Sequence, residues 1–324
     1  MKSISKLWDK SLTLFNPVTH FRKYWHRHGT SQKIITVHEM ACFIIMLVVS
    51  FYSLLGPWLI SFPSDLHVVN PQEVVFPFES YNHLLGTDIY GRDLLDVFLL
   101  GINKSFLISL VVVLIVALLV MPLAIIMGYY IGKNSFISKL SAPLIMFVPL
   151  FYYFVLSALF GPTIFIAGMS VLLHAMILSY YALYRDVVQI MTKSLVKNLM
   201  LDGATFKHIV RLVLLPLLMP NIFRILRRTL ILVVTELILI GVLQLGINPT
   251  SVYWGNVIYQ AWVHRDMNPY TLFVVTALVS VILYAAFVSF RVAERLVTER
   301  IDLMQHGKRQ KRQEQFIAQS TSNL

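Results

Sequence analysis

Long apolar stretches separated by short polar segments run through most of the chain. Six of these stretches are long enough, and poor enough in charge, to form membrane-spanning helices. They lie at residues 37–61, 105–130, 140–160, 163–184, 229–247 and 270–291. Proline and glycine within several stretches predict bent helices, as at Pro122 and Gly128 of the second. The pattern therefore predicts an all-α integral membrane protein with six transmembrane helices.

The polar segments between and beyond these stretches define the predicted domain organisation. A basic arm precedes the first span, an acidic extracytoplasmic segment follows it, and a transmembrane domain with a large cytoplasmic loop comes next. A basic tail closes the chain, and its Gln- and Ser-rich composition predicts disorder. The boundaries are 1–36 for the arm, 37–61 for the first helix, 62–104 for the acidic segment, 105–291 for the domain, 185–228 for its loop and 292–324 for the tail.

The charges of these segments predict their side of the membrane. The arm, the turn at 131–139, the loop at 185–228 and the tail are basic, whereas the segment at 62–104 is acidic. Because cytoplasmic loops of membrane proteins are enriched in Lys and Arg, both termini and the 185–228 loop are expected in the cytoplasm. These loops also explain the formal net charge of +11, which therefore does not indicate a nucleic-acid partner.

Composition excludes a water-soluble domain and several kinds of cysteine site. Apolar residues make up 57% of the chain, and the mean hydropathy is +0.71, which excludes a water-soluble domain. Cys42 is the only cysteine, so a disulfide within the chain and a cysteine-based zinc or redox motif are excluded. The histidines near the N-terminus lack metal-binding spacing and are expected beside lipid headgroups. They are His20, His26, His28 and His38.

The cytoplasmic loop contains a short basic stretch with helical periodicity, from Asp202 to Pro220. Apolar residues recur at helical spacing, and cations such as Lys207 and Arg211 lie between them. Asp202 is placed to cap the helix, and the prolines from Pro216 onwards are expected to end it. The predicted amphipathic helix either lies on acidic lipid or docks into a groove of a partner protein.

A second local pattern, L-G-T-D-x-x-G-R-D, lies in the acidic segment. It consists of Leu85, Gly86, Thr87, Asp88, Gly91, Arg92 and Asp93. Taken alone, it predicts a capped turn in which Asp88 begins a helix and Arg92 pairs with Asp88 or Asp96. No histidine, serine or metal-ligand partner follows at useful spacing, so a catalytic role is not expected.

Two ionisable residues lie deep inside predicted spans, His174 in the fourth and Glu236 in the fifth. Ionisable groups inside a bilayer are costly and usually face a cavity or a partner. His174 therefore either lines a pathway or bonds to a neighbouring helix. Glu236 is either a functional charge or the hydrogen-bond or ion-pair partner of another span.

Three motifs resemble those of one transporter family. Gly203, followed by a helical run to Leu215-Pro216, resembles the cytoplasmic EAA loop of binding-protein-dependent ABC importers; Lys197-Asn198-Leu199 stands at the E-A-A positions. The L-G-T-D-x-x-G-R-D pattern is characteristic of the dipeptide, oligopeptide and nickel permeases within that superfamily. The residues after the fifth span are similar to that family's run E…LSFLGLG…P…WG. They are Glu236, Gly241, Leu245, Gly246, Pro249, Trp254 and Gly255.

The resemblance extends from Leu85 to Gly255 and is to the C-type permease subunit of the peptide/nickel group. Its main departure besides E-A-A is that Val242-Leu243-Gln244-Leu245-Gly246 replaces F-L-G-L-G. Met200-Leu201-Asp202-Gly203-Ala204 is similar to the R-L-D-G-A run of Sap-type peptide permeases.

The resemblance implies the transmembrane domain of a type I ABC importer in the bacterial cytoplasmic (inner) membrane. The chain would be a non-catalytic permease subunit for peptides or similar small solutes, cationic ones among them. Its implied partners are a homologous permease, two ATPase subunits that bind ATP and Mg, a periplasmic substrate-binding protein and membrane lipid. The implied ATPase-coupling residues are Asp202, Gly203, Ala204, Thr205, Phe206, Lys207, Arg211 and Pro216. No cofactor is expected on the chain, because it lacks a G-x-x-x-x-G-K-[ST] phosphate loop.

Two other classes of function are weighed against this one. A secondary transporter driven by an ion gradient would use Glu236 as its intramembrane charge, but that class needs paired charges and broken helices in both halves. An intramembrane enzyme would need a His-Glu, Asp-Asp or Ser-His constellation within the spans, and the predicted spans contain none.

Overall fold

The computed structural model describes residues 36–59, 75–79, 81, 83–132, 149–246, 248 and 251–322. The chain divides into two units, Met1–Met40 and Ala41–Leu324, and only residues 36–40 of the first are described. The predictions for the basic arm, for much of the acidic segment, for the first half of the third span and for Pro249 therefore lie outside the described residues.

Within these ranges the chain is helical, with turns and an isolated bridge between Thr87 and Asp93 but no strand. Four helical segments are long and apolar enough to cross a membrane. They are Val37–Gly56, Leu94–Tyr130, Ile164–Met191 and Pro269–Glu299. These segments confirm the all-α class and coincide with the first, second, fourth and sixth predicted spans.

The third and fifth predicted spans are not among these four candidate segments. Helix α8, Pro149–Phe160, is apolar but short, and it covers only the described end of the third stretch. Helix α12, Leu215–Val242, is long enough and covers most of the fifth stretch. However, α12 carries several charges along its length, and it is not among the apolar candidates. These charges are Arg224, Arg227, Arg228 and Glu236.

The second span begins earlier than the sequence predicts. Helix α4, Leu94–Gly101, continues through π-helix η2, Ile102–Phe106, into α5, Leu107–Ile115. Asp93 starts this run, because its carboxylate accepts a hydrogen bond from Leu95 N at 2.7 Å. The last part of the predicted extracytoplasmic segment is therefore helical, and the cap is Asp93 rather than Asp88.

Two prolines are absorbed by widened helical turns instead of ending or breaking a helix. Pro122, in α6 (Met121–Tyr130), follows π-helix η3 (Val116–Val120). Pro216, in α12, follows π-helix η5 (Val210–Leu214) at the same offset. A proline ring clashes with the carbonyl four residues earlier, which in both cases lies inside the wider π-turn.

The basic stretch is consequently part of a long helical run. Helix α11, Phe206–Ile209, passes through η5 directly into α12, and Pro220 lies inside α12. The prediction that Pro216 ends the helix is therefore wrong. The basic stretch is joined to the 28-residue helix α12 without a break.

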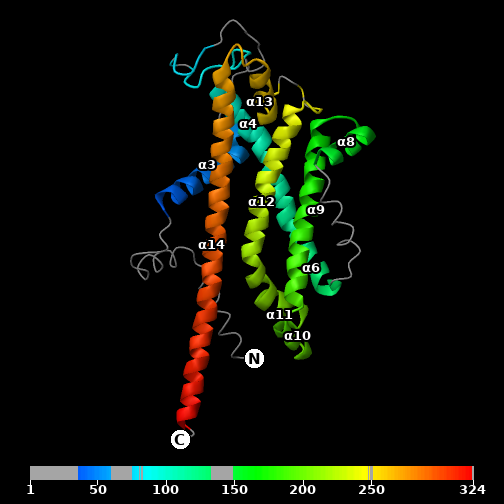
Figure 1. Ribbon diagram of the computed structural model, residues 1–324, viewed down its shortest axis with the longest axis vertical. Helices are drawn as coiled ribbons and strands as arrows, with labels where there is room; N and C mark the ends of the chain where they lie inside the picture. Colours follow the sequence, from blue (N-terminus) through cyan, green and yellow to red (C-terminus); the bar gives the residue numbers. More distant parts are fainter. Residues whose placement is uncertain are drawn as a thin grey trace. The chain divides into compact units, whose positions relative to one another are not determined.

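Helices α9 (Ile164–Met191) and α12 pack side by side and form the centre of the packing (Figure 1). Helices α6 and α8 pack on α9, whereas α13 (Trp254–Val263) and α14 (Pro269–Ser322) pack on α12. Two apolar clusters of buried side chains follow this division. One lies around α9 and the other around α13 and the first turns of α4.

Helix α14 extends well past its apolar part. Its candidate span ends at Glu299, and the helix continues to Ser322. The prediction of a disordered tail at 292–324 is thus corrected, because residues 292–322 are helical. Gln, Glu, Lys and Arg, which are abundant there, have favourable helix propensities despite their polarity.

Candidate functional site

The predicted coupling segment folds as two helices joined by a tight turn. Helix α10, Ser194–Leu201, ends at Asp202, and Gly203 adopts φ +80°. Gly203 N donates to Met200 O at 3.1 Å, and Ala204 N donates to Leu199 O at 3.0 Å. This pair of bonds is a Schellman motif, whose left-handed position favours glycine. Asp202 therefore closes α10 instead of capping the following helix.

The turn presents a mixed basic and apolar surface. Most of the predicted coupling residues are exposed; these are Asp202, Gly203, Thr205, Lys207 and Arg211. Two leucines beside them are also exposed, Leu201 at 85% and Leu212 at 69%. Ala204 and Pro216 are half-buried. At the E-A-A positions, Lys197 and Asn198 are exposed, whereas Leu199 packs on the apolar core.

Phe206 faces its own chain. Its ring lies 4.8 Å from the Tyr129 ring and 5.4 Å from the Tyr130 ring, measured between centroids. Both tyrosines lie at the end of α6, and the Tyr184 hydroxyl bonds to Gly132 O nearby. Phe206 therefore anchors the turn to the second span, and a partner surface would consist of its exposed neighbours.

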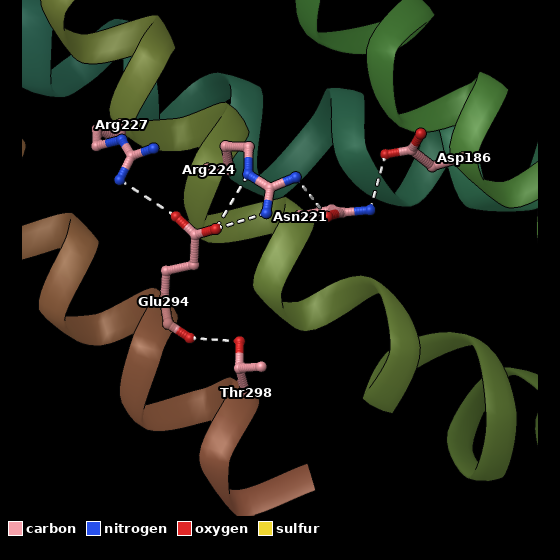
Figure 2. A network of polar contacts seen from close by, with 6 residues as sticks. All are labelled: Asp186, Asn221, Arg224, Arg227, Glu294 and Thr298. Atoms are coloured by element: carbon pink, nitrogen blue, oxygen red, sulfur yellow. Dashed lines mark hydrogen bonds and ion pairs between the residues drawn. The ribbon is translucent and has the colours of Figure 1, made fainter. Parts of the chain in front are cut away.

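A polar network joins α9, α12 and α14, and its α12 residues follow the basic stretch Asp202–Pro220 directly, as Figure 2 shows. Arg224 of α12 donates to Glu294 Oε1 of α14 through Nε at 3.0 Å and Nη2 at 2.6 Å. Arg227 Nη1 lies 3.2 Å from Glu294 Oε2. Asn221 accepts from Arg224 at 3.1 Å and donates to Asp186 of α9 at 3.1 Å. The sequence does not predict this network, because its members come from three distant segments.

The two deep ionisable residues contact each other. His174 Nδ1 of α9 lies 2.6 Å from Glu236 Oε1 of α12, and both side chains are buried. The Tyr152 ring of α8 stacks on the imidazole at 5.8 Å. For His174, the structure supports the bond to a neighbouring helix. For Glu236, the partner lies within the same chain, so the expectation that the predicted spans contain no His-Glu pair is wrong. The pairing could have been foreseen, because each residue needs a polar partner at that depth.

The L-G-T-D-x-x-G-R-D pattern folds into a compact turn before α4. Asp88 Oδ1 accepts from Tyr90 N and Arg92 N at 2.9 Å each, and Asp88 Oδ2 accepts from Arg92 Nε at 2.6 Å. The predicted Arg92–Asp88 pair is thus confirmed, and it is buried. Burial raises the pKa of the Tyr90 phenol; Arg92 opposes that shift and Asp88 adds to it. Asp93 also contacts His83, with Nδ1 and Oδ2 2.8 Å apart.

The remaining residues of this motif hold the turn to its surroundings. Thr87 Oγ1 accepts from Val75 N at 2.8 Å, and Thr87 O accepts from Asn268 Nδ2 at 3.3 Å. Gly86 O accepts from Leu94 N, and Gly91 N donates to Asp88 O. Leu85 packs on the cluster around α13. The arrangement is that of a structural connector between the start of α4 and the start of α14.

Trp254 and Gly255 form a close helix contact. The Trp254 indole is fully buried, stacks on Phe98 at 5.7 Å, and donates to Phe98 O at 3.4 Å. A Cβ on Gly255 would lie 2.4 Å from Ile238 O, so only glycine lets α13 approach α12 this closely. Gly246 lies in the turn after α12. These motif residues are packing residues.

The chain matches no protein-family model, and no curated protein matches it. Among the described residues, no group of three His, Cys, Asp or Glu side chains is placed to hold a metal ion.

Proposed function

We propose that this chain is the permease subunit of an ABC transporter that moves peptides or similar small solutes, cationic ones among them. The observation that carries the proposal is the exposed turn between α10 and α11. Exposed residues flank this turn in the sequence: Leu201 precedes it, and Lys207, Arg211 and Leu212 follow it. Exposed apolar groups rimmed by charge are typical of protein contact sites, and this one lies where the coupling motif of the resembled family occurs.

The proposed architecture is the type I importer domain. Six spans with both termini in the cytoplasm would form half of the pathway, and a homologous permease would supply the other half. Two ATPase subunits with ATP and Mg would bind the cytoplasmic turn, and a periplasmic substrate-binding protein would dock on the opposite side. The basic loops would lie against anionic lipid headgroups.

Continuity of the helices supports a coupling role. Helix α11 passes into α12 without a break, so a displacement of the turn moves α12 as a rigid element. The network of Figure 2 links α12 to α14 through Glu294 and to α9 through Asp186. In the proposed mechanism, closure of the ATPase dimer draws the turns together, and the linked spans rock between inward- and outward-open states.

The test is copurification followed by ATP hydrolysis. The full chain, tagged and purified from its native membranes in mild detergent, should retain a subunit with a G-x-x-x-x-G-K-[ST] loop and show ATPase activity. Lys207→Glu and Leu201→Asp reverse charge and apolarity at exposed positions. Each should lower the retained ATPase activity at least tenfold, on the order of 1.4 kcal/mol or more of contact energy.

Arg265→Glu is the matched control. Arg265 is also an exposed cation, but it lies after α13 and stacks over its neighbour Trp262 at 4.8 Å. This variant should keep the full ATPase activity. The proposal is contradicted if the wild-type chain retains no such subunit, or if Lys207→Glu and Leu201→Asp hydrolyse ATP as well as Arg265→Glu does.

The buried His174–Glu236 contact favours a second candidate, a secondary transporter driven by an ion gradient. Such transporters place ionisable pairs inside the membrane. Uptake by this class would stop when the ion gradient is collapsed at constant ATP, whereas uptake by the ABC class would continue. Measuring uptake in cells with a protonophore and a maintained ATP supply separates the two.

A further inference from the structure

The His174–Glu236 contact leaves one oxygen of the buried Glu236 carboxyl group without a hydrogen bond to any described residue. The exposed fraction of the His174 side chain is 8%, and that of Glu236 is 6%. Glu236 Oε1 contacts His174 Nδ1, whereas Glu236 Oε2 is buried and has no hydrogen-bond partner among the described residues. Half of this carboxyl group therefore lacks any donor.

The surroundings offer little to an ionised carboxylate. The Tyr152 ring stacks on the imidazole. On the same two helices, α9 and α12, the hydroxyl of Ser170 donates to Ala167 O, and those of Ser179 and Thr229 bond to each other. Within the described ranges, no lysine, arginine or aspartate forms an ion pair with either member of the pair. Among the described residues, His174 is thus the one charge partner of Glu236.

Three protonation arrangements fit the contact, and in one of them a neutral imidazole with its proton on Nδ1 donates to a carboxylate. In the ionic arrangement, an imidazolium donates from Nδ1 to a carboxylate. In the neutral arrangement, a carboxylic acid donates from Oε1 to the unprotonated Nδ1. A buried ion pair is stable only when further hydrogen bonds satisfy its remaining lone pairs. A carbonyl oxygen without a donor costs less than a carboxylate oxygen without one, so the orphaned Oε2 favours the neutral arrangement.

We propose that His174 and Glu236 form a proton-binding site inside the membrane domain, with the proton on Glu236 and donated to His174. Because both side chains are buried where α9 and α12 meet, water would reach the pair on separation of these helices. Glu236 then releases its proton to water, and the pair changes from neutral to one negative charge. When the helices close again, the carboxylate takes a proton back. The site would thereby link the packing of these two helices to the proton concentration.

Infrared difference spectroscopy tests this assignment on the full chain, purified in detergent with any subunits that accompany it. The difference between wild type and Glu236→Gln at neutral pH should contain the C=O stretch of a protonated carboxylic acid, and the band should shift in D2O. His174→Gln should move that band, because the acid loses its imidazole acceptor. The readout needs neither a partner nor transport, so it fails independently of the proposed function.

Glu294→Gln is the matched control. Glu294 forms ion pairs with Arg224 and Arg227, so this variant should remove a carboxylate band and leave the acid band intact. The proposal is overturned if the wild type shows only a carboxylate band at Glu236. It is equally overturned if His174→Gln leaves the acid band unchanged. This second comparison does not require Glu236→Gln, so it remains a test if that variant fails to fold.

Discussion

At the scale of single residues, Gln244 occupies the left-handed position that the resembled family fills with glycine. Its φ is +56°, and it follows the end of α12 in a second Schellman motif, with bonds from Gln244 N to Gly241 O and from Leu245 N to Ile240 O. A left-handed side chain costs about 1–2 kcal/mol. The Gln244 amide offsets part of this, because it donates to Gly241 O at 2.8 Å and to Asn256 Oδ1 at 3.3 Å.

Replacement of Gln244 separates these two effects. Gln244→Ala loses the amide bonds and keeps the strain, so it should destabilise the protein by about 1 kcal/mol. Gln244→Gly loses the same bonds but relieves the strain, so it should be about 1–2 kcal/mol more stable than the alanine variant. Thermal unfolding in detergent measures both. An alanine variant as stable as the glycine variant would show that this backbone is not left-handed.

Arg92 and Asp88 give a larger expected effect. The pair is buried, with 7% and 6% of the side chains exposed, and removal of one partner leaves the other charge uncompensated. Arg92→Gln should therefore cost about 3–5 kcal/mol. Lys207→Gln, at an exposed position, should change stability by less than about 0.5 kcal/mol. Equal melting temperatures for the two variants would contradict the buried turn.

The sequence predicts some residue contacts and misses others for identifiable reasons. The four-residue spacing of Asp88 and Arg92 predicts their pairing, although the pair closes a turn and not a helix. Asp93 is the true cap of α4, because the Asp88 carboxylate is already used by Tyr90 and Arg92. From the sequence, Phe206 is predicted to lie on the exposed face of a helix that docks on a partner. Only the packing reveals that it meets Tyr129 and Tyr130.

At the scale of elements, the link between α12 and α14 should depend more on Arg227 than on Arg224. The Arg224 side chain is 57% exposed, so solvent weakens its pairing, whereas Arg227 is 16% exposed and also lies 4.8 Å over the Phe287 ring. Arg227→Ala should cost about 2 kcal/mol, and Arg224→Ala less than about 1 kcal/mol.

A double-mutant cycle of each arginine with Glu294→Gln isolates the two pair energies in thermal unfolding. The cycle with Arg227 should give the larger coupling energy. A larger coupling energy for Arg224 would show that the ion pair of Arg227 with Glu294 is not the main polar contact of the network. The α12–α14 link would then have to depend on apolar packing.

The boundaries of elements are where sequence reasoning is weakest here. Apolar length finds the spans, but it places the start of the second at 105 and not at Leu94, because the cap at Asp93 lies in a polar segment. The helix end predicted at Pro216 does not occur, because a π-helix precedes this proline, and a π-helix also precedes Pro122, where the sequence predicts a bend. The spacing of apolar residues does not predict a π-helical turn. The continuous helical segment from Phe206 to Val242 could therefore not be predicted from the positions of the prolines.

At the scale of the whole molecule, six crossings and four crossings give different topologies. The fifth predicted span coincides with the charged helix α12, which is not among the four apolar candidates. If only those four segments crossed, the loop at 185–228 would lie outside. That loop carries a large excess of cations, and cytoplasmic placement of Lys and Arg favours six crossings. These cations are Arg185, Lys193, Lys197, Lys207, Arg211, Arg224, Arg227 and Arg228.

Labelling of single cysteines decides between the two topologies. The native Cys42 is buried, so it should give little background with a membrane-impermeant maleimide. Tyr81→Cys, at a position that is 99% exposed, should react in intact cells under either topology and serves as the positive control. Lys197→Cys is the discriminating position, because it is exposed and lies between the fourth and fifth predicted spans.

With six crossings, Lys197→Cys reacts only after the membrane is opened, whereas with four it reacts as readily as Tyr81→Cys. The charge distribution predicts the first result. Reaction of Lys197→Cys in intact cells would place the Gly203 turn on the side away from ATP. No ATPase subunit could then bind that turn, and the coupling role proposed for Lys207 and its neighbours would be lost together with the six-span topology.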